Sequence, residues 1–478
     1  MPHARRATPR VPRHNSGCMR ALLFLLLTAA HLVAASAPTA LDRYVAAPDS
    51  SYKWELAAKK EVAGAQVAIL DMTSQTWRSA AEVDRPQWRH WLTVIRPKSV
   101  KTNIGLLFIT GGANGRPAPD RPDAMLLSIA NETGMVVGEL RNVPNQTLRF
   151  LDDPAARNRT EDALIAYTWD KYLRTGDELW PARLPMTKAA VRAMDTITAF
   201  AKTPDGGSLT IDKFAVSGAS KRGWTTWTTA AVDKRVVAIA PLVIDLLNIV
   251  PSFVHHWRAY GFWAPAINDY TEARTMDWMG TPQYKALMKI EEPYEYRDRL
   301  TMPKLIINAS GDDFFLPDSS QFYFKDLAGE KHLRYVPNTR HNLNPSDVPQ
   351  TLTAFLSSVV DNRPRPDFKF EIKKDGAIEV KDAGAPKEVL LWQITNAKAR
   401  DFRLTTTGSN WKSSPLAASK GKYTARVPKP AAGYTAYFVE LTYDSGGKFP
   451  HKFTTGIKVV PDTYPFPPPK PGDGLAKK

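Results

Sequence analysis

The chain has 478 residues, of which 43% are hydrophobic and 23% are charged. This composition is typical of a globular protein and excludes a wholly disordered chain, and the length predicts two or three domains of roughly 100–200 residues. The formal net charge is +16, which is compatible with an anionic surface as a partner. The lysines and arginines form no run interleaved with aromatic residues, so we expect no nucleic-acid partner.

Residues 1–35 are typical of a signal peptide. Five arginines and no acidic residue precede the apolar run 21–30, and small residues at 33–35 suit cleavage after Ala35. Removal of this segment would lower the net charge from +16 to +11. The apolar run is too short to span a bilayer, and no later segment has 18 consecutive apolar residues. We therefore expect an exported protein, periplasmic or extracellular, that does not span a membrane.

The only cysteine of the chain, Cys18, lies within this predicted signal peptide. The mature protein is therefore expected to have no disulfide and no cysteine metal site. Met19 directly precedes the arginine that leads into the apolar run, and it is an alternative start of the chain.

Residues 36–362 show short apolar runs that alternate with longer amphipathic stretches. Runs rich in Val, Ile and Leu are typical of strands buried on both faces. Their alternation with helical stretches predicts an α/β fold, a mostly parallel sheet with helices on both faces. The first two runs are too close for a crossover helix, which favours an antiparallel pair. The predicted strands are 66–72, 91–95, 105–110, 135–140, 213–217, 236–243, 304–309 and 332–336, and the clearest helices are 187–203 and 345–360.

The composition changes at residues 362–366, where two prolines alternate with arginines. In the region 367–461, short segments of alternating polar and apolar residues are separated by turns, and Asp375-Gly376 is typical of a tight hairpin. This pattern predicts a C-terminal immunoglobulin-like β-sandwich domain. The remaining residues, 462–478, are expected to form a proline-rich tail without regular structure.

A serine lies at the predicted turn between a strand and a helix. The strand 213–217 leads into Gly218-Ala219-Ser220-Lys221-Arg222-Gly223, and a helical stretch follows. A sharp turn of this kind needs glycines because the helix passes close to the strand, and it lifts the hydroxyl clear of the sheet at the helix N-terminus. Ser220 is therefore a candidate nucleophile, with a simple helix cap as the alternative role.

Acidic residues and a histidine follow later predicted strands. Asp312 and Asp313 come just after strand 304–309, and His341 comes just after strand 332–336. A serine, an acid and a histidine, in this order and each past a strand, are typical of an α/β-hydrolase triad. We predict Ser220 as nucleophile and His341 as general base, and either Asp312 or Asp313 as the acid.

A glycine-rich turn after strand 105–110 predicts an oxyanion hole. Its residues Gly111 to Asn114 allow backbone N–H groups to approach a substrate oxygen. Gly112 and Ala113 are the candidate donors there, together with the N–H of Lys221. A plain glycine turn is the alternative.

An insertion of aromatic-rich sequence, about residues 245–300, separates two of the predicted strands. At this position of an α/β-hydrolase, an insertion is expected to cover the serine as a lid. Its aromatic residues either enclose the substrate or form the lid's own core. His255 and His256 have no further ligands at helical spacing, so we expect no metal site there.

Four stretches resemble the PhoPQ-activated pathogenicity-related proteins: VPNQ at 143–146, LPMTKAA at 184–190, GASKRGWTTW at 218–227 and SGDDFFLP at 310–317. The resemblance covers nearly the whole mature chain. It implies an exported protein with an α/β-hydrolase core. One eukaryotic branch of this family has been linked to dipeptidyl-peptidase-like activity.

These observations predict an exported serine hydrolase that cleaves an ester or peptide bond of a small molecule or peptide. No metal or organic cofactor is expected. The spacing from Ser220 through a basic residue to Gly223 also resembles glucuronoyl esterases, so a carbohydrate esterase is one alternative. A non-catalytic secreted binding protein on a hydrolase scaffold is another.

Arg222 occupies a position where glycine is usual, since the helix packs tightly there. A guanidinium at this point must be paired or reach the cleft. We predict an ion pair in the site, with Asp245 or Glu139 as the partner.

Overall fold

The computed structural model describes residue 8 and residues 37–381 and 383–473. Apart from residue 8, the predicted signal peptide lies outside the described residues, and so do Cys18, Met19 and the end of the tail. Residues Pro38–Lys478 form one compact unit, separate from Met1–Ala37. In the part of the chain that is described, no helix is long and apolar enough to cross a membrane.

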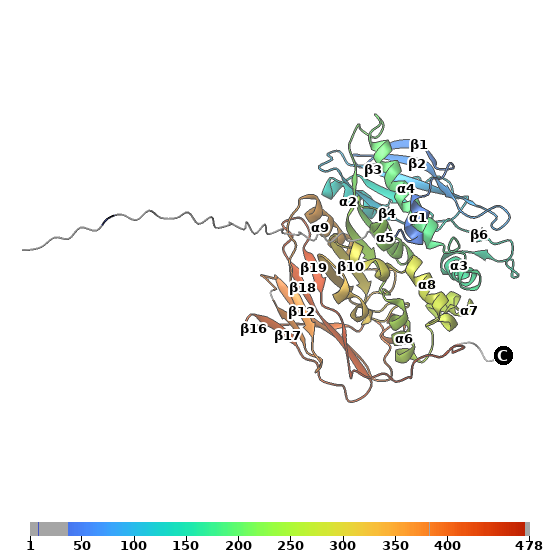
Figure 1. Cartoon of the computed structure of the whole chain (residues 1–478). Helices are drawn as coiled ribbons and strands as arrows, with labels where there is room; N and C mark the ends of the chain where they lie inside the picture. Colours follow the sequence, from blue (N-terminus) through green and yellow to red (C-terminus); the bar gives the residue numbers. More distant parts are fainter. Residues whose placement is uncertain (1–7, 9–36, 382, 474–478) are drawn as a thin grey trace, which may run out of the picture. The chain divides into compact units, whose positions relative to one another are not determined.

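The protein is mixed α/β and is built on a long sheet whose central strands are parallel, as predicted (Figure 1). Each of these strands coincides with a predicted apolar run, and nearly all of their residues are buried. In spatial order they are β5 (Val137–Leu140), β4 (Ile104–Ile109), β8 (Lys213–Ala219), β9 (Val236–Leu242), β10 (Lys304–Ala309) and β11 (Lys331–Val336).

Antiparallel strands extend this sheet at its N-terminal side. The strands β2 (Ala65–Thr76) and β3 (Gln87–Arg96) pair antiparallel, which confirms the prediction for the first two runs. In addition, β1 (Lys53–Val62) pairs with β2. The sequence did not indicate β1 because its lysines and glutamates leave most of it exposed and no apolar run marks it.

Helices lie on both faces of the central sheet. Successive residues of β4 point to opposite faces, so Leu106 and Phe108 belong to one buried apolar cluster and Leu107 and Ile109 to another. The first cluster includes α2 (Ala124–Thr133) and α9 (Val348–Val360), and the second includes α4 (Arg183–Ala201) and α5 (Lys221–Val232). Shorter elements on this part of the chain are α1 (Ala40–Ala46), β6 (Leu148–Arg149) and β7 (Asn158–Arg159).

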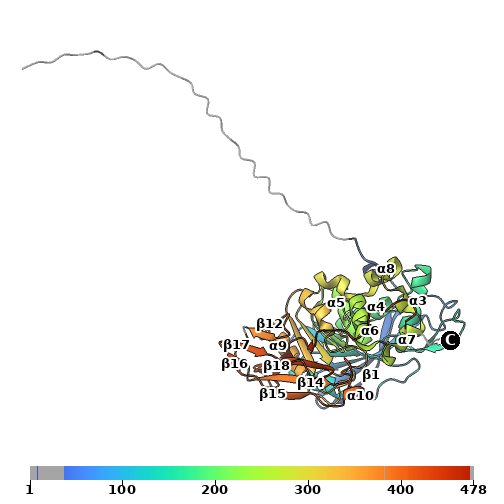
Figure 2. The same cartoon turned by 90° about the horizontal axis from the view of Figure 1, so that it is seen from below.

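The C-terminal strands form two sheets, and one of them continues the central sheet (Figures 1 and 2). Leu333 of β11 pairs with Thr454 of β19 (His451–Thr454), and the sheet then runs on through further antiparallel strands. These are β18 (Tyr434–Tyr443), β14 (Glu388–Asn396) and β15 (Lys412–Pro415), with β20 (Lys458–Val460) also paired to β18.

The second C-terminal sheet contains the hairpin expected at Asp375-Gly376. Its strands are β12 (Lys369–Ile372), β13 (Ile378–Lys381), β17 (Lys422–Ala425) and β16 (Ala418–Ser419), in this order, and a short helix, α10 (Leu404–Thr407), follows β14. Beyond β20, residues 461–473 form no helix or strand but make defined contacts. The Tyr464 hydroxyl lies 2.8 Å from Nδ1 of His255, and Nε1 of Trp263 donates to the carbonyl of Asp473 at 3.1 Å.

Residues 245–300 form a group of short helices between β9 and β10. Several aromatic side chains of this group are buried, among them Phe253, Trp263, Tyr270 and Tyr284. The group packs against α3 (Glu161–Thr175), beside which α7 and α8 lie in Figure 1. Its elements are α6 (Ile249–Tyr260), η1 (Pro265–Ile267), α7 (Asn268–Glu272), η2 (Thr275–Trp278), α8 (Pro282–Glu291) and η3 (Pro293–Arg299).

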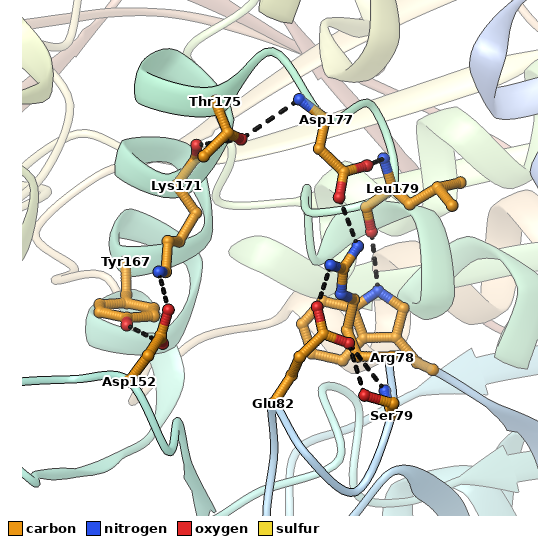
Figure 3. Close-up of polar contacts among 10 residues, drawn as sticks. Arg78, Ser79, Glu82, Asp152, Tyr167, Lys171, Thr175, Asp177 and Leu179 are labelled. Carbon is orange, nitrogen blue, oxygen red and sulfur yellow. Dashed lines mark hydrogen bonds and ion pairs between the residues drawn. The ribbon is translucent and has the colours of Figure 1, made fainter.

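Ion pairs anchor α3 and the loop that follows it, as Figure 3 shows. The guanidinium of Arg78, in the loop after β2, donates to Asp177 at 2.8 Å, just past the end of α3. Lys171 of α3 pairs with Asp152 in the segment that leads to the helix. These contacts fix the position of α3, whose first residues contact the N-terminus of α5.

Candidate active site

Ser220 lies at a sharp turn between β8 and α5. Its backbone has φ +58° and ψ −125°, a region that costs a non-glycine residue about 1–3 kcal/mol. The turn is fixed because the N–H of Ser220 donates to the carbonyl of Leu242 at 2.8 Å and its carbonyl accepts from Trp224 N at 3.0 Å. The side chain makes no capping hydrogen bond to α5. The hydroxyl is therefore available for another role.

The two glycines beside Ser220 permit this turn. A Cβ atom at Gly223 would lie 2.9 Å from the carbonyl oxygen of Leu242, and one at Gly218 would lie 2.8 Å from that of Arg222. Both distances are below van der Waals contact and both involve backbone atoms. Any larger residue at either position would push α5 away from the sheet.

His341 and Asp312 form a hydrogen-bonded pair. Nδ1 of His341 lies 2.8 Å and 3.0 Å from the two oxygens of Asp312, and Phe314 N donates to the same carboxylate at 2.8 Å. When a neutral imidazole donates from Nδ1 to a carboxylate, its Nε2 is left as an acceptor. Nε2 is buried and has no hydrogen-bond partner among the residues that the structure describes.

Of the two acids that the sequence left open, the structure places Asp312 against His341. Asp313 points elsewhere and pairs with Nε of Arg340 at 3.0 Å. The Asp312 side chain is 3% exposed, whereas that of Asp313 is 20% exposed. Asp312 is therefore the better placed to orient the imidazole.

A pocket that opens to solvent lies beside Ser220, and its space is about 420 Å³ with the adjoining solvent included. Phe314 lines it and also lies against the His341 ring, with ring centroids 4.3 Å apart. Residues of the segment 245–300 form part of the wall. The lining residues are Asp162, Trp169, Arg183, Ser220, Lys221, Trp224, Ile244, Leu246, Ile249, Phe253, Ile267, Tyr270, Phe314 and Phe315.

Arg222 pairs with Glu161, the first residue of α3. Two nitrogens of its guanidinium lie 2.6 Å and 2.7 Å from the carboxylate, and Nε donates to the carbonyl of Val143. The predicted partners are engaged elsewhere: Asp245 accepts from two tyrosines, and Glu139 pairs with Arg141 at 3.0 Å. The prediction of an ion pair for Arg222 is therefore right, but both predicted partners are wrong. The sequence does not indicate that the segment leading to α3 passes close to Arg222.

Lys221 joins the same cluster of charges. Its buried ammonium lies 3.0 Å from Glu161 and 3.0 Å from Asp162. Burial by itself raises the pKa of Glu161, but the hydrogen bonds and charge of Arg222, with the charge of Lys221, lower it to about 2. Neither Glu161 nor Asp162 was predicted from the sequence as part of the site. The only signal was two acidic residues after Thr160 at a helix start, a common helix-capping pattern.

Gly112 and Ala113 are not among the residues that line the pocket beside Ser220, although Gly111 lies next to Arg222 of α5. Gly112 and Ala113 line a separate pocket with Trp91, Glu139 and others. The turn is held there because Nε2 of Gln146 donates to the carbonyl of Gly112 at 2.9 Å. Lys221 stays close to the serine as the first residue of α5, where backbone N–H groups have no intrahelical acceptor.

Asp245 is a buried acid, and the hydroxyls of Tyr323 and Tyr335 each donate to it at 2.6 Å. Burial raises the pKa of Asp245 to about 7; the two tyrosine hydrogen bonds oppose this rise, and the charges of Asp312 and Asp318 add to it. The ordinary aspartate pKa is about 4. The folded state therefore holds this proton at pH values where the unfolded chain has lost it.

The contribution of Asp245 to stability is fully present below pH about 4 and is lost as the pH rises through about 7. We expect the free energy of unfolding of wild type, minus that of Asp245→Asn, to fall by on the order of 2–4 kcal/mol from pH 4 to pH 8. Urea denaturation at each pH measures it. Burial also raises the pKa of Glu292 to about 7. Because both proteins contain Glu292, its contribution cancels when the free energy of unfolding of the variant is subtracted from that of wild type. A difference that stays constant with pH would contradict the expectation.

Within the described ranges, no group of three His, Cys, Asp or Glu side chains is arranged to hold a metal ion. His255 contacts Asp318 at 2.8 Å, and Nε2 of His256 accepts from the N–H of Ala264 at 3.0 Å. Both histidines thus have protein partners within the segment 245–300 and its neighbours.

Comparison with known proteins identifies relatives of this chain. The family model described as PhoPQ-activated pathogenicity-related protein matches residues 41–403. The chain is 39% identical over 478 residues to autocrine proliferation repressor protein A of Dictyostelium discoideum, an alignment that covers 94% of this chain and 95% of that protein.

Solved structures with a related fold include two carbohydrate esterases. Acetyl xylan esterase 1 from Thermoanaerobacterium sp. is 14% identical with a TM-score of 0.46, and glucuronoyl esterase from Solibacter usitatus is 14% identical with a TM-score of 0.37. Each alignment covers 67% of this chain and 91% of the other. The family match is of a different kind, because it extends over most of the sequence. The chain belongs to the PhoPQ-activated pathogenicity-related protein family.

Proposed function

We propose that the protein is a serine hydrolase of the α/β-hydrolase fold that cleaves an ester or peptide bond, with Ser220, His341 and Asp312 as its catalytic triad. The observation that carries the proposal is the pair of Asp312 and His341, which lies against Phe314 in the wall of the pocket that Ser220 also lines. Nε2 of His341 is not hydrogen-bonded to Ser220 in this structure, and the mechanism requires this bond to form in the substrate complex. Membership of the family supports a hydrolase-like scaffold.

In the proposed mechanism, the oxygen of Ser220 attacks the substrate carbonyl carbon while Nε2 of His341 takes the hydroxyl proton. Asp312 holds the ring by its bond to Nδ1 and stabilises the imidazolium. The N–H of Lys221, at the N-terminus of α5, donates to the oxyanion. When the tetrahedral intermediate collapses, the leaving group receives the proton from Nε2, and water then releases the acyl group by the same steps.

A fluorophosphonate probe tests the nucleophile, because it phosphonylates an activated serine. We expect covalent labelling of the folded wild type at Ser220, located by peptide mass spectrometry, and none in Ser220→Ala. Ser419→Ala changes an exposed serine in β16 and should label as wild type does. A folded wild type that takes up no probe would remove Ser220 as the nucleophile.

The substrate class is tested with a small panel. A simple acyl ester, an aminoacyl arylamide and a methyl ester of a sugar acid separate an esterase, a peptidase and a glucuronoyl-type carbohydrate esterase by their kcat/KM values. The aromatic wall of the pocket accommodates either an apolar acyl group or a stacked sugar.

The proposal extends to the other parts of the chain. Residues 1–35 act as a signal peptide that directs export to the periplasm or the extracellular space, and residues 245–300 form a lid over the serine. Support for the lid comes from Ile249, Phe253, Ile267 and Tyr270, which line the pocket. The strands of residues 367–461 form a β-sandwich domain.

A second candidate function is that of a secreted regulator that acts by binding. The name of the relative from Dictyostelium discoideum, a proliferation repressor, favours it. The two functions differ in their need for the nucleophile. Folded Ser220→Ala would keep its full effect in a proliferation assay if the protein acts by binding, and would lose it if catalysis is required.

A further inference from the structure

A buried arginine with two unpaired guanidinium nitrogens lines the pocket beside Ser220. Arg183, at the start of α4, is 4% exposed, and its guanidinium lies 3.9 Å from the ring centre of Trp224 and 5.6 Å from that of Trp169. Its Nε and Nη1 are buried and have no acceptor among the residues that the structure describes. A buried charge and buried N–H groups left unpaired are costly, so this arrangement indicates that a ligand supplies the acceptor.

The carboxylates near Arg183 are occupied by other donors. Glu291 accepts from Nε1 of Trp169 and, at 3.3 Å, from the backbone N–H of Arg183, not from its guanidinium. Asp162 lies 3.0 Å from the ammonium of Lys221 and accepts from the hydroxyl of Tyr270 at 3.0 Å. Lys221 and Arg222 are thus paired with acids of α3. The charge of Arg183 opposes the rise in the pKa of Glu291 that burial causes, but Nε and Nη1 of Arg183 donate to no carboxylate among the described residues.

The shape of the pocket restricts the anion. Its wall is mainly aromatic and aliphatic, and the central carbon of the guanidinium lies 3.9 Å from the centre of a tryptophan ring. An N–H group of a guanidinium donates a short, charge-assisted hydrogen bond to a carboxylate oxygen. A phosphate would bring more oxygens and more charge into a wall that offers few further donors.

We infer that Arg183 binds a carboxylate group of the substrate, so that the enzyme acts on esters or amides that carry a free carboxylate next to an apolar or aromatic group. This inference rests on the proposed function, because Arg183 and Ser220 line the same pocket. Arg183 takes no part in bond cleavage: it holds the substrate while Ser220 attacks the carbonyl.

Two probes of nearly equal shape test the inference. Here 3-phenylpropionate carries a carboxylate and 3-phenylpropionamide does not, and each competes with fluorophosphonate labelling of Ser220. In wild type we expect the carboxylate to protect Ser220 at concentrations about 10–100-fold lower than the amide, the usual range for a hydrogen-bonded ion pair. In Arg183→Met the two probes should protect equally.

The controls separate binding from folding. Arg192→Met removes another arginine of α4 that stacks on a ring, 4.8 Å from the ring centre of Tyr52, and should keep the preference of wild type. If Arg183→Met does not fold, Arg183→Lys retains the charge without the planar fork. It should weaken protection by the carboxylate several-fold and leave the amide unchanged.

Failure of the inference and failure of the proposed function give different results. A wild type that is labelled at Ser220 but is protected equally by both probes overturns the role of Arg183 and leaves the proposed function standing. A folded wild type without labelling overturns the proposed function and this inference with it. Arg183→Met that folds and keeps the carboxylate preference also overturns the inference.

Discussion

Replacement of Asp312 by Asn should lower kcat/KM by about 10³–10⁴-fold on any ester that the protein hydrolyses, with little change in fold. Asn retains the size of the side chain but can present its amide N–H₂ to the ring. The hydrogen bond from Nδ1 to the carboxylate, now 2.8 Å, fixes the tautomer in which Nε2 accepts a proton. Without this hydrogen bond the ring can adopt the tautomer that carries its proton on Nε2. Nε2 then cannot accept the proton of the serine, and His341 cannot act as a base.

The neighbouring acid provides the matched control. Asp313 pairs with Arg340, whose side chain is 51% exposed, and such surface pairs contribute about 0–1 kcal/mol. Asp313→Asn should therefore change kcat/KM by no more than a few-fold. Steady-state hydrolysis of an aryl ester by the two variants measures the contrast. Equal losses in the two variants would show that Asp312 has no special role as the triad acid.

Replacement of Glu161 by Gln should lower the free energy of unfolding by about 2–3 kcal/mol. The change leaves Arg222, whose side chain is 11% exposed, without its carboxylate and removes one of the two partners of Lys221. Breaking a fully buried pair costs roughly 3–5 kcal/mol. The expected loss is smaller because the Glu161 side chain is 38% exposed and water can screen part of the charge.

Glu178→Gln is the control for this prediction. Glu178 forms an equally short pair with Arg43, at 2.7 Å, but both side chains are about half exposed, at 48% and 54%. It should change stability by less than about 1 kcal/mol. Urea denaturation at neutral pH compares the variants. If Glu161→Gln were no more destabilising than Glu178→Gln, the cluster at the start of α5 would not stabilise the fold.

The parts of the site that follow parallel strands could be predicted from the sequence. Ser220 and His341 come just after β8 and β11, whose Val, Ile and Leu content marks them as buried, and the carboxyl ends of parallel strands meet at one edge of a sheet. The choice between Asp312 and Asp313 could not be predicted. Adjacent residues face different ways, and only the path of the loop after β10 decides which one meets the histidine.

Contacts made by segments without a repeating hydrophobic pattern could not be predicted from the sequence. Glu161 reaches Arg222 because of the course of residues 141–160, which contain only the short strands β6 and β7. Arg183 looks like any arginine at the start of a helix. Its burial depends on two tryptophans from α3 and α5 that come together only in the folded protein.

The pairing of β11 with β19 means that the C-terminal strands cover the edge at which the parallel part of the central sheet ends. A chain that ended at residue 403, where the family match stops, would lack β18 and β19. The outer edge of β11 would then present unpaired N–H and C=O groups, and β14 would lose its long antiparallel neighbour. Bare edges of this kind recruit strands from other molecules. The C-terminal strands therefore cover an edge through which the central sheet could otherwise pair with a second copy of the chain.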